Sequence, residues 1–183
     1  MSTLQGQFLV ASPHLPDVNF FRSVVLIIQH DDDGAFGVVL NRPTENTVGE
    51  FWEMISKEPC ESTELVNHGG PVAGSVLALH TDHNCSETEV IPGVHVSTAH
   101  DNIEQIVQQR DKPYRIFCGY AGWSGGQLEH ELEAGGWMTI KADLDEIFAC
   151  EDDLWERAAQ SIGLDILTPL VAPERIPADP TLN

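Results

Sequence analysis

Long apolar runs mark the first quarter of the chain. Residues 23–30 (SVVLIIQH) are almost continuously apolar, and a second run, AFGVVL, follows the acidic turn DDDG at 31–34. Uninterrupted runs of this kind are typical of strands that are buried on both faces. The Asp-Gly pair between them indicates a hairpin, because glycine supplies the positive φ that a tight turn requires. Residues 7–11 (QFLVA) predict an earlier short strand.

The rest of the chain alternates between helical and strand-like patterns. Residues 47–56 carry apolar side chains at helical spacing, and Thr47 is the expected N-cap because its hydroxyl oxygen can accept a backbone N–H bond. We find no internal repeat and no linker, which indicates one α+β domain. The further expected helices cover 100–110, 127–134, 144–148 (after a cap at Asp143) and 152–162. The further expected strands cover 65–68, 75–80, 114–120 and 137–142, with two short strands around Pro92-Gly93 in 89–98.

The C-terminal segment has a different composition from the domain. Residues 169–183 (PLVAPERIPADPTLN) contain four prolines in 15 positions, which favours an extended chain without a packed core. We therefore expect one domain over residues 1–168 and a proline-rich extended or disordered tail over 169–183.

Net charge excludes several classes of partner. The chain has 9 Lys and Arg against 29 Asp and Glu, a formal net charge of −20, and its cations are dispersed along the sequence. Binding to DNA depends on neutralising several phosphates with clustered cations, so direct DNA binding is not expected. The same charge opposes binding to anionic lipid.

The expected compartment is the cytoplasm. The N-terminal sequence MSTLQGQFLVASPHL has no basic region and only a short apolar run, and no stretch reaches 18 consecutive apolar residues. The four cysteines lie far apart without a C-x-x-C pair, so we expect reduced thiols that pack as small apolar side chains.

Residues 119–127 (GYAGWSGGQ) contain a match to a catalytic motif. The segment 122–126 (GWSGG) fits the G-x-S-x-G pattern of a hydrolase nucleophile elbow, with a strand before it and a helix after it. That arrangement needs an acid and then a histidine downstream of Ser124. Only His130 follows, six residues on within the expected helix, where it cannot turn back. A glycine-rich turn is therefore the preferred interpretation, and a hydrolase or transferase using the Gly119–Gln127 loop is the alternative.

Metal binding is not expected from the spacing of ligand-type residues. The three aspartates at 31–33 lack the D-x-D-x-D-G spacing and distal glutamate of a calcium loop. His80 and His83 flank a turn, and an H-x-x-H in a loop is not a zinc framework. We expect no metal and no cofactor.

Eight residues at strand ends and tight turns are the candidates for binding a ligand or partner. An arginine there could hold an anion or pair with one of the chain's own carboxylates, and a Gly-Gly turn could offer backbone N–H groups to an anion or simply bend the chain. A tryptophan in a glycine loop could stack on a ligand or anchor the core. The hypothesis is that these residues share one surface: Arg22, Asn41, Arg42, Gly69, Gly70, Gly122, Trp123 and Gln127.

Several segments in collinear order resemble the AlgH/YqgE family of bacterial proteins. The resemblance covers nearly the whole chain and departs only at the end, where related proteins tend to stop near a Gly-His-Ala. The matching segments are GQFLVASPHLPDVNFFRSVVLIIQHDDDGAFGVVLNRP (6–43), HGGPV (68–72), LALH (77–80), GYAGWSGGQLEHEL (119–132), Trp137 and WERAAQSIGLDIL (155–167).

The resemblance implies a compact α+β fold with a strongly curved, partly barrel-like mixed sheet flanked by helices. The family is named for an effect on alginate gene regulation and is often described as regulating transcription, while no enzymatic activity is established for it as a class. Its motif does not require a serine at the place of Ser124. The function expected is therefore that of a non-enzymatic binding or regulatory protein. It would act indirectly, through a protein or a small anionic molecule.

Overall fold

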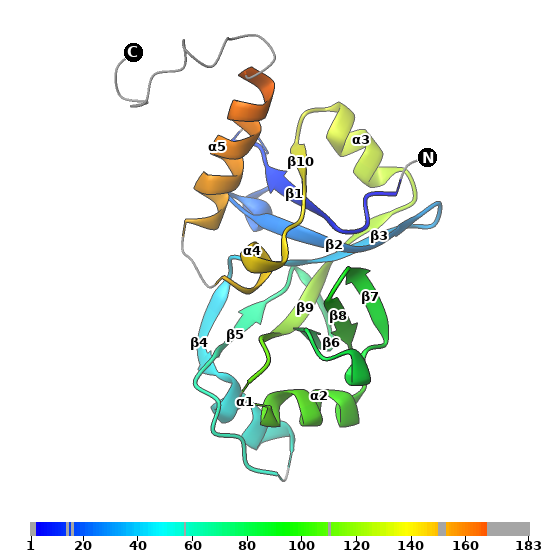
Figure 1. Ribbon diagram of the computed structural model, residues 1–183. Coiled ribbons are helices and arrows are strands. Elements are labelled where there is room, and N and C mark those ends of the chain that lie inside the picture. Colours follow the sequence, from blue (N-terminus) through cyan, green and yellow to red (C-terminus); the bar gives the residue numbers. More distant parts are fainter. Residues whose placement is uncertain are drawn as a thin grey trace, which may run out of the picture.

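The computed structural model describes residues 3–13, 15, 17–56, 58–109, 111–149 and 153–167, and the proline-rich segment 169–183 lies outside them. Within this part of the chain ten strands form one mixed sheet with the order β10-β1-β2-β3-β9-β6-β8-β7, and β5 joins β9 and carries β4 (Figure 1). Only the β5–β9 pairing is parallel among the described pairings. The strands are β1 (Gln7–Ala11), β2 (Val24–Asp31), β3 (Gly34–Val39), β4 (Pro43–Thr47), β5 (Leu65–His68), β6 (Val72–His80), β7 (Thr88–Ile91), β8 (Val94–Ser97), β9 (Tyr114–Ser124) and β10 (Trp137–Lys141).

The sheet curls so that its far edge returns toward its beginning. Gln5, just before β1, donates from Nε2 to the carbonyl oxygen of Glu89 in β7 at 3.2 Å. Gly6 lies against Ile91 of the same strand. Because β7 is the last strand in the sheet order and β1 the second, this contact requires strong curvature. The expected α+β fold with a curved, partly barrel-like sheet is confirmed.

Helices occupy both ends of the molecule. In Figure 1, α1 (Val48–Ile55) and α2 (His100–Gln108) lie at one end, and α3 (Gln127–Glu133) and α5 (Leu154–Leu167) at the other, with α4 (Leu144–Phe148) between them. Short 3-10 turns cover Val18–Phe20 and His83–Cys85. None of the described helices is both long enough and apolar enough to cross a membrane.

Local sequence explains how the helices at the α1–α2 end begin. Thr47 accepts from the backbone N–H of Glu50 and the Glu50 carboxylate accepts from that of Thr47, a capping box that confirms the expected N-cap. The first turn of α2 lacks a side-chain cap of its own. Instead the carboxylate of Glu87 accepts from the N–H groups of Thr98 and Ala99 at 2.8–3.0 Å. A carboxylate is favoured at a helix N-terminus by the helix dipole.

Strand β9 differs from the expected pattern, because it continues to Ser124, beyond the expected end of the strand at residue 120 and into the predicted glycine loop. Phe117 packs in one core cluster and Ala121 in another, although residues four apart in a regular strand face the same side. The break lies at Gly119, whose φ of 75° is left-handed. A glycine at such a bulge turns the strand without a Cβ clash. The glycines therefore extend the strand around the curve of the sheet.

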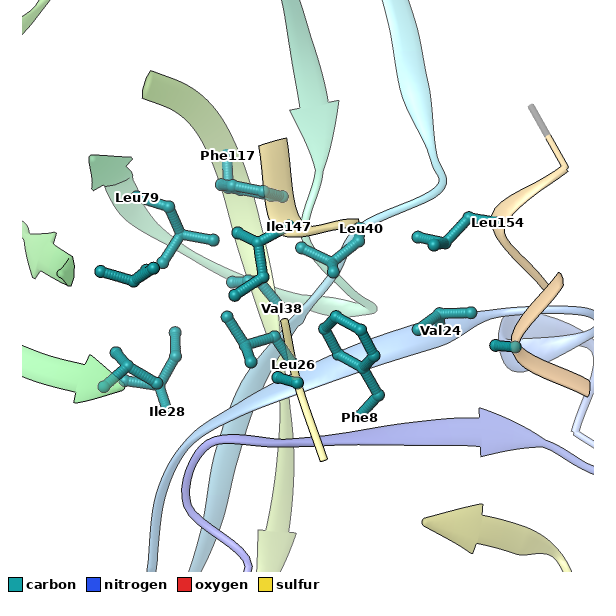
Figure 2. Close-up of a cluster of buried hydrophobic side chains, with 14 of the residues drawn as sticks. Phe8, Val24, Leu26, Ile28, Val38, Leu40, Leu79, Phe117, Ile147 and Leu154 are labelled. Atoms are coloured by element: carbon teal, nitrogen blue, oxygen red, sulfur yellow. The ribbon is translucent and has the colours of Figure 1, made fainter. Parts of the chain in front are cut away.

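Two core clusters lie on the two faces of strands β1, β2 and β3. The first lies between the strands and helices α4 and α5, and Figure 2 shows Phe8, Leu26, Val38, Phe117 and Ile147 of this cluster. The second lies on the opposite face and is closed by Phe20, Trp123, Trp137 and Leu128 of α3. A third cluster packs α1 and α2 against β6 and β9.

A buried arginine joins four elements at the centre of the molecule. Arg115 in β9 donates to the carbonyl oxygen of Ile147 in α4 at 3.0 Å, to that of Leu40 after β3, and to Oδ1 of Asn67 in β5 at 2.6 Å. Its guanidinium also lies over the ring of Phe117, 5.4 Å from the centroid. Hydrogen bonds of this kind satisfy a cation that would otherwise be costly to bury.

Candidate functional site

Three of the predicted site residues, Arg22, Asn41 and Arg42, meet where β3 ends and β2 begins. Asn41 accepts at Oδ1 from the backbone N–H of Val24 at 2.9 Å and donates from Nδ2 to the carbonyl oxygen of Arg22 at 2.8 Å. Arg42 donates from Nη2 to the carbonyl oxygen of Phe21 and from Nη1 to that of Asn41 at 3.2 Å. Two side chains from one segment thus hold the backbone of the other.

Arg22 adopts a backbone conformation that is rare for its residue type. Its φ is 50°, and it is the one non-glycine residue in the described chain with positive φ. Such conformations cost energy and persist only where surrounding contacts enforce them. The contacts here are those of Asn41 and Arg42 with the neighbouring carbonyl groups. The turn is therefore held in place by specific hydrogen bonds.

Apolar side chains project from this turn. Val18 is 85% exposed and Phe21 is 56% exposed. The guanidinium of Arg22 lies over Phe21 at 5.4 Å and over Trp155 of α5 at 5.2 Å, measured to the ring centroids. Its Nη1 is 3.6 Å from Oε1 of Glu156, which is also exposed. We call residues 18–22 together with Asn41 and Arg42 the arginine turn.

The two arginines differ in what they bind. Arg22 forms a loose ion pair with the carboxylate of Glu156. Pairing with one of the chain's own carboxylates was one of the two alternatives predicted for the arginines. Arg42 is half-buried, burial lowers the pKa of its guanidinium, and its described bonds go to backbone carbonyl groups. Arg42 thus supports the backbone of the turn, while Arg22 presents its charge at the surface.

The Gly69–Gly70 turn lies beside the arginine turn. The backbone N–H of His68 donates to the carbonyl oxygen of Arg42 at 2.8 Å, and that of Val39 donates to Gly69 at 2.8 Å. The N–H of Gly69 is bonded to the carbonyl oxygen of Cys118 at 2.9 Å, so it is not presented to an anion. A Cβ on Gly70 would lie 2.3 Å from the carbonyl oxygen of Tyr120. Close packing of three backbone segments therefore explains both glycines.

The backbone of the third predicted segment, with Gly122, Trp123 and Gln127, runs beside and beyond the start of β3. Ser124 pairs with Gly34 at the start of β3, whereas Asn41 follows the end of that strand. Seven residues of extended chain span about 20 Å. Gly122 packs against the ring of Tyr120. The structure therefore brings Arg22, Asn41, Arg42, Gly69 and Gly70 together and places Gln127 away from them.

Trp123 is a core residue, only 6% exposed. Its ring stacks on Phe20 at 5.9 Å and meets Trp137 edge-on at 5.9 Å. Its indole N–H donates to Oε2 of Glu131 at 3.0 Å, and the indole N–H of Trp137 donates to the same oxygen at 2.8 Å. Gln127 accepts from the N–H of Ser124 and donates to Oε1 of Glu131. This segment is fixed by its own contacts, and Phe20 connects it to the arginine turn.

Ser124 occupies a strand position. It is exposed at the last residue of β9, and in the described chain no histidine is hydrogen-bonded to it. His130 lies at an exposed position of α3, six residues after Ser124. The geometry therefore gives no support to the nucleophile elbow.

Three histidines gather near the 3-10 turn His83–Cys85, where His95 joins the His80 and His83 pair of the sequence. The ring centroid of His95 is 5.8 Å from that of His80 and 5.5 Å from that of His83. His80 accepts at Nδ1 from the N–H of Asp82, so Nε2 carries the proton and faces Ser97 Oγ at 3.0 Å. Burial and the nearby His95 lower the pKa of His80 to about 4.

That proton position excludes His80 as a base for Ser97, whose hydroxyl donates to the carbonyl oxygen of Cys85. Among the described residues no group of three His, Cys, Asp or Glu side chains is arranged to hold a metal ion. The histidine group is therefore best understood as part of the packing around β6 and β8.

Sequence patterns did not reveal the side chains that surround Arg22. Val18 begins a short 3-10 turn and Phe21 is the residue that ends it, and this segment has no helical or strand periodicity. Trp155 and Glu156 come from α5, more than 130 residues further along the chain. The one available signal was two consecutive aromatic residues followed by arginine (FFR, 20–22) next to an expected buried strand.

Comparison with known proteins places this geometry in a family. A family profile described as AlgH-like (DUF179) matches residues 8–167. A UPF0301 protein of Thioalkalivibrio sulfidiphilus is 39% identical over 172 residues, covering 90% of this chain and 92% of the relative. A UPF0301 protein of Xanthomonas axonopodis pv. citri is 37% identical over 171 residues, covering 89% and 91%.

Solved structures of similar proteins have the same fold as this chain. The solution structure of the AlgH protein from Pseudomonas aeruginosa superposes with a TM-score of 0.74 at 28% identity, covering 93% of this chain and 96% of that one. The crystal structure of protein DIP2367 from Corynebacterium diphtheriae gives a TM-score of 0.70 at 25% identity, with 88% of each chain covered. The profile match, the relatives and the shared fold together show that this chain belongs to the AlgH-like UPF0301 family.

Proposed function

We propose that this protein is a non-enzymatic binding protein of the cytoplasm that acts through a protein partner, and that the arginine turn is its partner-binding surface. The observation that carries the proposal is the strained Arg22 backbone held by Asn41 and Arg42. Strain that neighbouring contacts enforce is common at ligand and partner sites, where it presets a conformation for binding. A turn that is already ordered loses little entropy when a partner binds.

The exposed groups of the turn favour a partner segment that is both acidic and apolar. Val18 and Phe21 supply apolar contacts, and aromatic and arginine side chains are the residues that most often dominate interface energies. Arg22 supplies a cation in a chain of net charge −20. An acidic segment would be repelled by most of this protein and attracted here. Glu156 is the internal carboxylate that such a segment would displace.

A regulatory effect on transcription would then be indirect. The partner would be a protein that itself contacts nucleic acid or its polymerase, because the net charge of this chain opposes direct contact with phosphates. The support is the location of the cation and the apolar groups on one preset turn, together with the composition of the rest of the chain.

Site-specific photo-crosslinking tests the surface. A benzoyl-phenylalanine would be placed at Val18 or Phe21, and at Met54 of α1 as a control that is 69% exposed at the other end of the molecule. The expected result is one shared adduct from positions 18 and 21 that is absent from position 54. The adduct would then be identified and the partner purified.

Affinity measurements with the purified partner complete the test. Phe21→Ala and Arg22→Ala should each weaken binding about 10-fold or more, as expected for central interface residues. Met54→Ala should leave the dissociation constant within about twofold, because surface changes away from an interface have small effects. Equal affinity of all variants, or the same adduct from position 54, would contradict the proposal.

A further inference from the structure

A cleft of about 750 Å³ lies beside the C-terminal end of α2, and residues of the arginine turn do not line it. Its walls are the loop 59–64, the C-terminal end of α2 and residues 111–114, with Phe148 of α4 contributing from one side. This volume is in the range of clefts that hold small organic ligands. None of its lining residues was a candidate from the sequence.

The first wall of the cleft is held in place from three directions. Tyr114 donates from its hydroxyl to Ser62 Oγ at 2.5 Å, and Gln108 donates from Nε2 to the carbonyl oxygen of Pro59 at 2.8 Å. The backbone N–H of Gly49 donates to the carbonyl oxygen of Ser62 at 3.0 Å. Loop 59–64 is thus tied to β9, α2 and α1. Ligand sites are usually formed before the ligand binds, as this wall is.

The second wall is anchored on Asp82, which is buried. Lys112 Nζ lies 2.9 Å from Oδ1 of Asp82, and Gln109 donates from Nε2 to Oδ2 at 2.6 Å. The Lys112 ammonium holds the pKa of the Asp82 carboxyl well below its usual range. Lys112 is the only cation among the described residues that line the cleft, and Asp82 neutralises it.

The other charged side chains among the described residues of the lining are acidic. Glu61, Glu64 and Asp111 line it, and the C-terminal end of α2 contributes Val107, Gln108 and Gln109. Carbonyl groups at a helix C-terminus carry partial negative charge, and the last turn of α2 contains no basic residue. The helix dipole and the carboxylates therefore favour the same kind of ligand, a cation.

Apolar surface lies beside these charges. Pro59, Pro113, Phe148 and the ring of Tyr114 line the same cleft. A bare metal ion would not use such groups, whereas an organic cation can pack its hydrocarbon part against them and direct its charge to the carboxylates. We propose that this cleft binds an organic cation, an ammonium or guanidinium group carried on a short apolar arm.

Titration with defined probes, followed by backbone amide NMR shifts and calorimetry, tests the proposal. The probes are the free amines cadaverine and agmatine, and a short peptide, Gly-Gly-Arg-Gly-Gly. 1-Pentanol and pentanoate serve as neutral and anionic controls of similar length. Saturable shifts confined to amides of residues 59–64 and 108–114 are expected with a cationic probe and not with the controls. Binding of free amines alone would indicate a small-molecule source, and binding of the peptide alone would indicate a protein side chain.

Two charge variants provide the matched comparison. Glu64→Gln with Asp111→Asn should weaken binding of the cationic probe at least fivefold, because both carboxylates line the cleft and are exposed. Asp32→Asn with Glu133→Gln removes the same charge from exposed positions outside the cleft and should leave binding within twofold. The proposal is overturned by equal binding of 1-pentanol, by absence of saturable binding of every cationic probe, or by equal loss in both double variants.

Discussion

A single buried polar side chain can connect elements that strand pairing does not connect. Arg115 links β9 to α4, to the chain after β3 and to β5 through hydrogen bonds that fan out from one planar group. A lysine ammonium is a compact point charge and cannot reach acceptors arranged around the edge of a guanidinium. The side chain is therefore specified by geometry as well as by charge.

Arg115→Lys should lower the free energy of unfolding by about 2–4 kcal/mol, because it buries a charge while leaving carbonyl acceptors unmatched. Urea denaturation followed by circular dichroism measures the change. Arg157→Lys is the control, since Arg157 pairs with Asp153 at 3.1 Å near the surface of α5 and should shift stability by less than about 0.5 kcal/mol. Similar losses in the two variants would show that Arg115 does not have this linking role.

His80 makes stability depend on pH in a defined window. The ring is 1% exposed, and the neighbouring His95 adds to the effect of burial, while Asp82 and Glu87 act in the opposite direction. Its pKa is lowered from 6.5 to about 4. Between these values the unfolded chain binds a proton that the folded protein does not bind. The free energy of unfolding therefore rises with pH from about 4 to 6.5 and falls on acidification, by up to about 3 kcal/mol.

His80→Gln should flatten this dependence. A glutamine can accept from the N–H of Asp82 and donate to Ser97, but it does not titrate. Unfolding free energies of the wild type and the variant would be compared at several pH values from 4 to 7. His130→Gln, at an exposed position of α3, should retain the slope of the wild type. An unchanged slope in His80→Gln would assign the pH dependence to other groups.

At the scale of elements, periodicity predicted most of the secondary structure. β1 matches the expected range 7–11, and the hairpin between β2 and β3, the helices α1 to α5 and the strand pair β7–β8 are confirmed within a few residues. Strand β4, with the sequence PTENT, was missed because it is polar and lies on β5 alone. The extension of β9 was missed because glycines that usually mark a loop here shape a bulge and a close strand crossing.

The candidate site was predictable only in its local part. Asn41 and Arg42 follow a buried strand directly, and this position indicated that their side chains would be near the sheet edge. Their hydrogen bonds to the backbone of residues 21–24 are tertiary contacts, which sequence patterns do not reveal. The same is true of Trp123, whose burial depends on Phe20 and Trp137 from distant segments.

Glu131 of helix α3 joins this helix to two tryptophans of the sheet. Glu131 accepts the indole N–H groups of both Trp123 and Trp137, and Gln127 donates to its other oxygen. Glu131→Ala should lower the free energy of unfolding by about 2–4 kcal/mol, because two buried donors lose their acceptor. Glu133→Ala, two residues further along the same helix and exposed, should cost less than about 0.5 kcal/mol. Equal stability of the two variants in urea would contradict this role of Glu131.

At the scale of the whole molecule, charge and curvature act together. The sheet closes on itself enough for residues before β1 to touch β7, and the helices cover its two ends. An excess of 20 negative charges surrounds this core. Repulsion between like charges keeps such proteins apart from each other and from polyanions. An acidic partner segment would therefore need a local exception to this charge, and we propose the arginine turn as that exception.

Direct binding to DNA is the interaction that this charge most clearly disfavours, and we expect none. Useful affinity for a duplex requires several clustered Lys or Arg contacts, whereas the described structure places Arg115 in the core, holds Lys112 on Asp82 and pairs Arg157 with Asp153. Gel-shift measurements with pure protein at about 150 mM salt, near physiological ionic strength, should show no retardation of duplex DNA at micromolar protein. The same measurement at about 50 mM salt should also show no retardation, because weak contacts between an acidic protein and DNA gain little affinity at low salt. Sub-micromolar, sequence-dependent retardation would contradict the prediction, and loss of that retardation in Arg22→Ala would then reassign the arginine turn to nucleic acid.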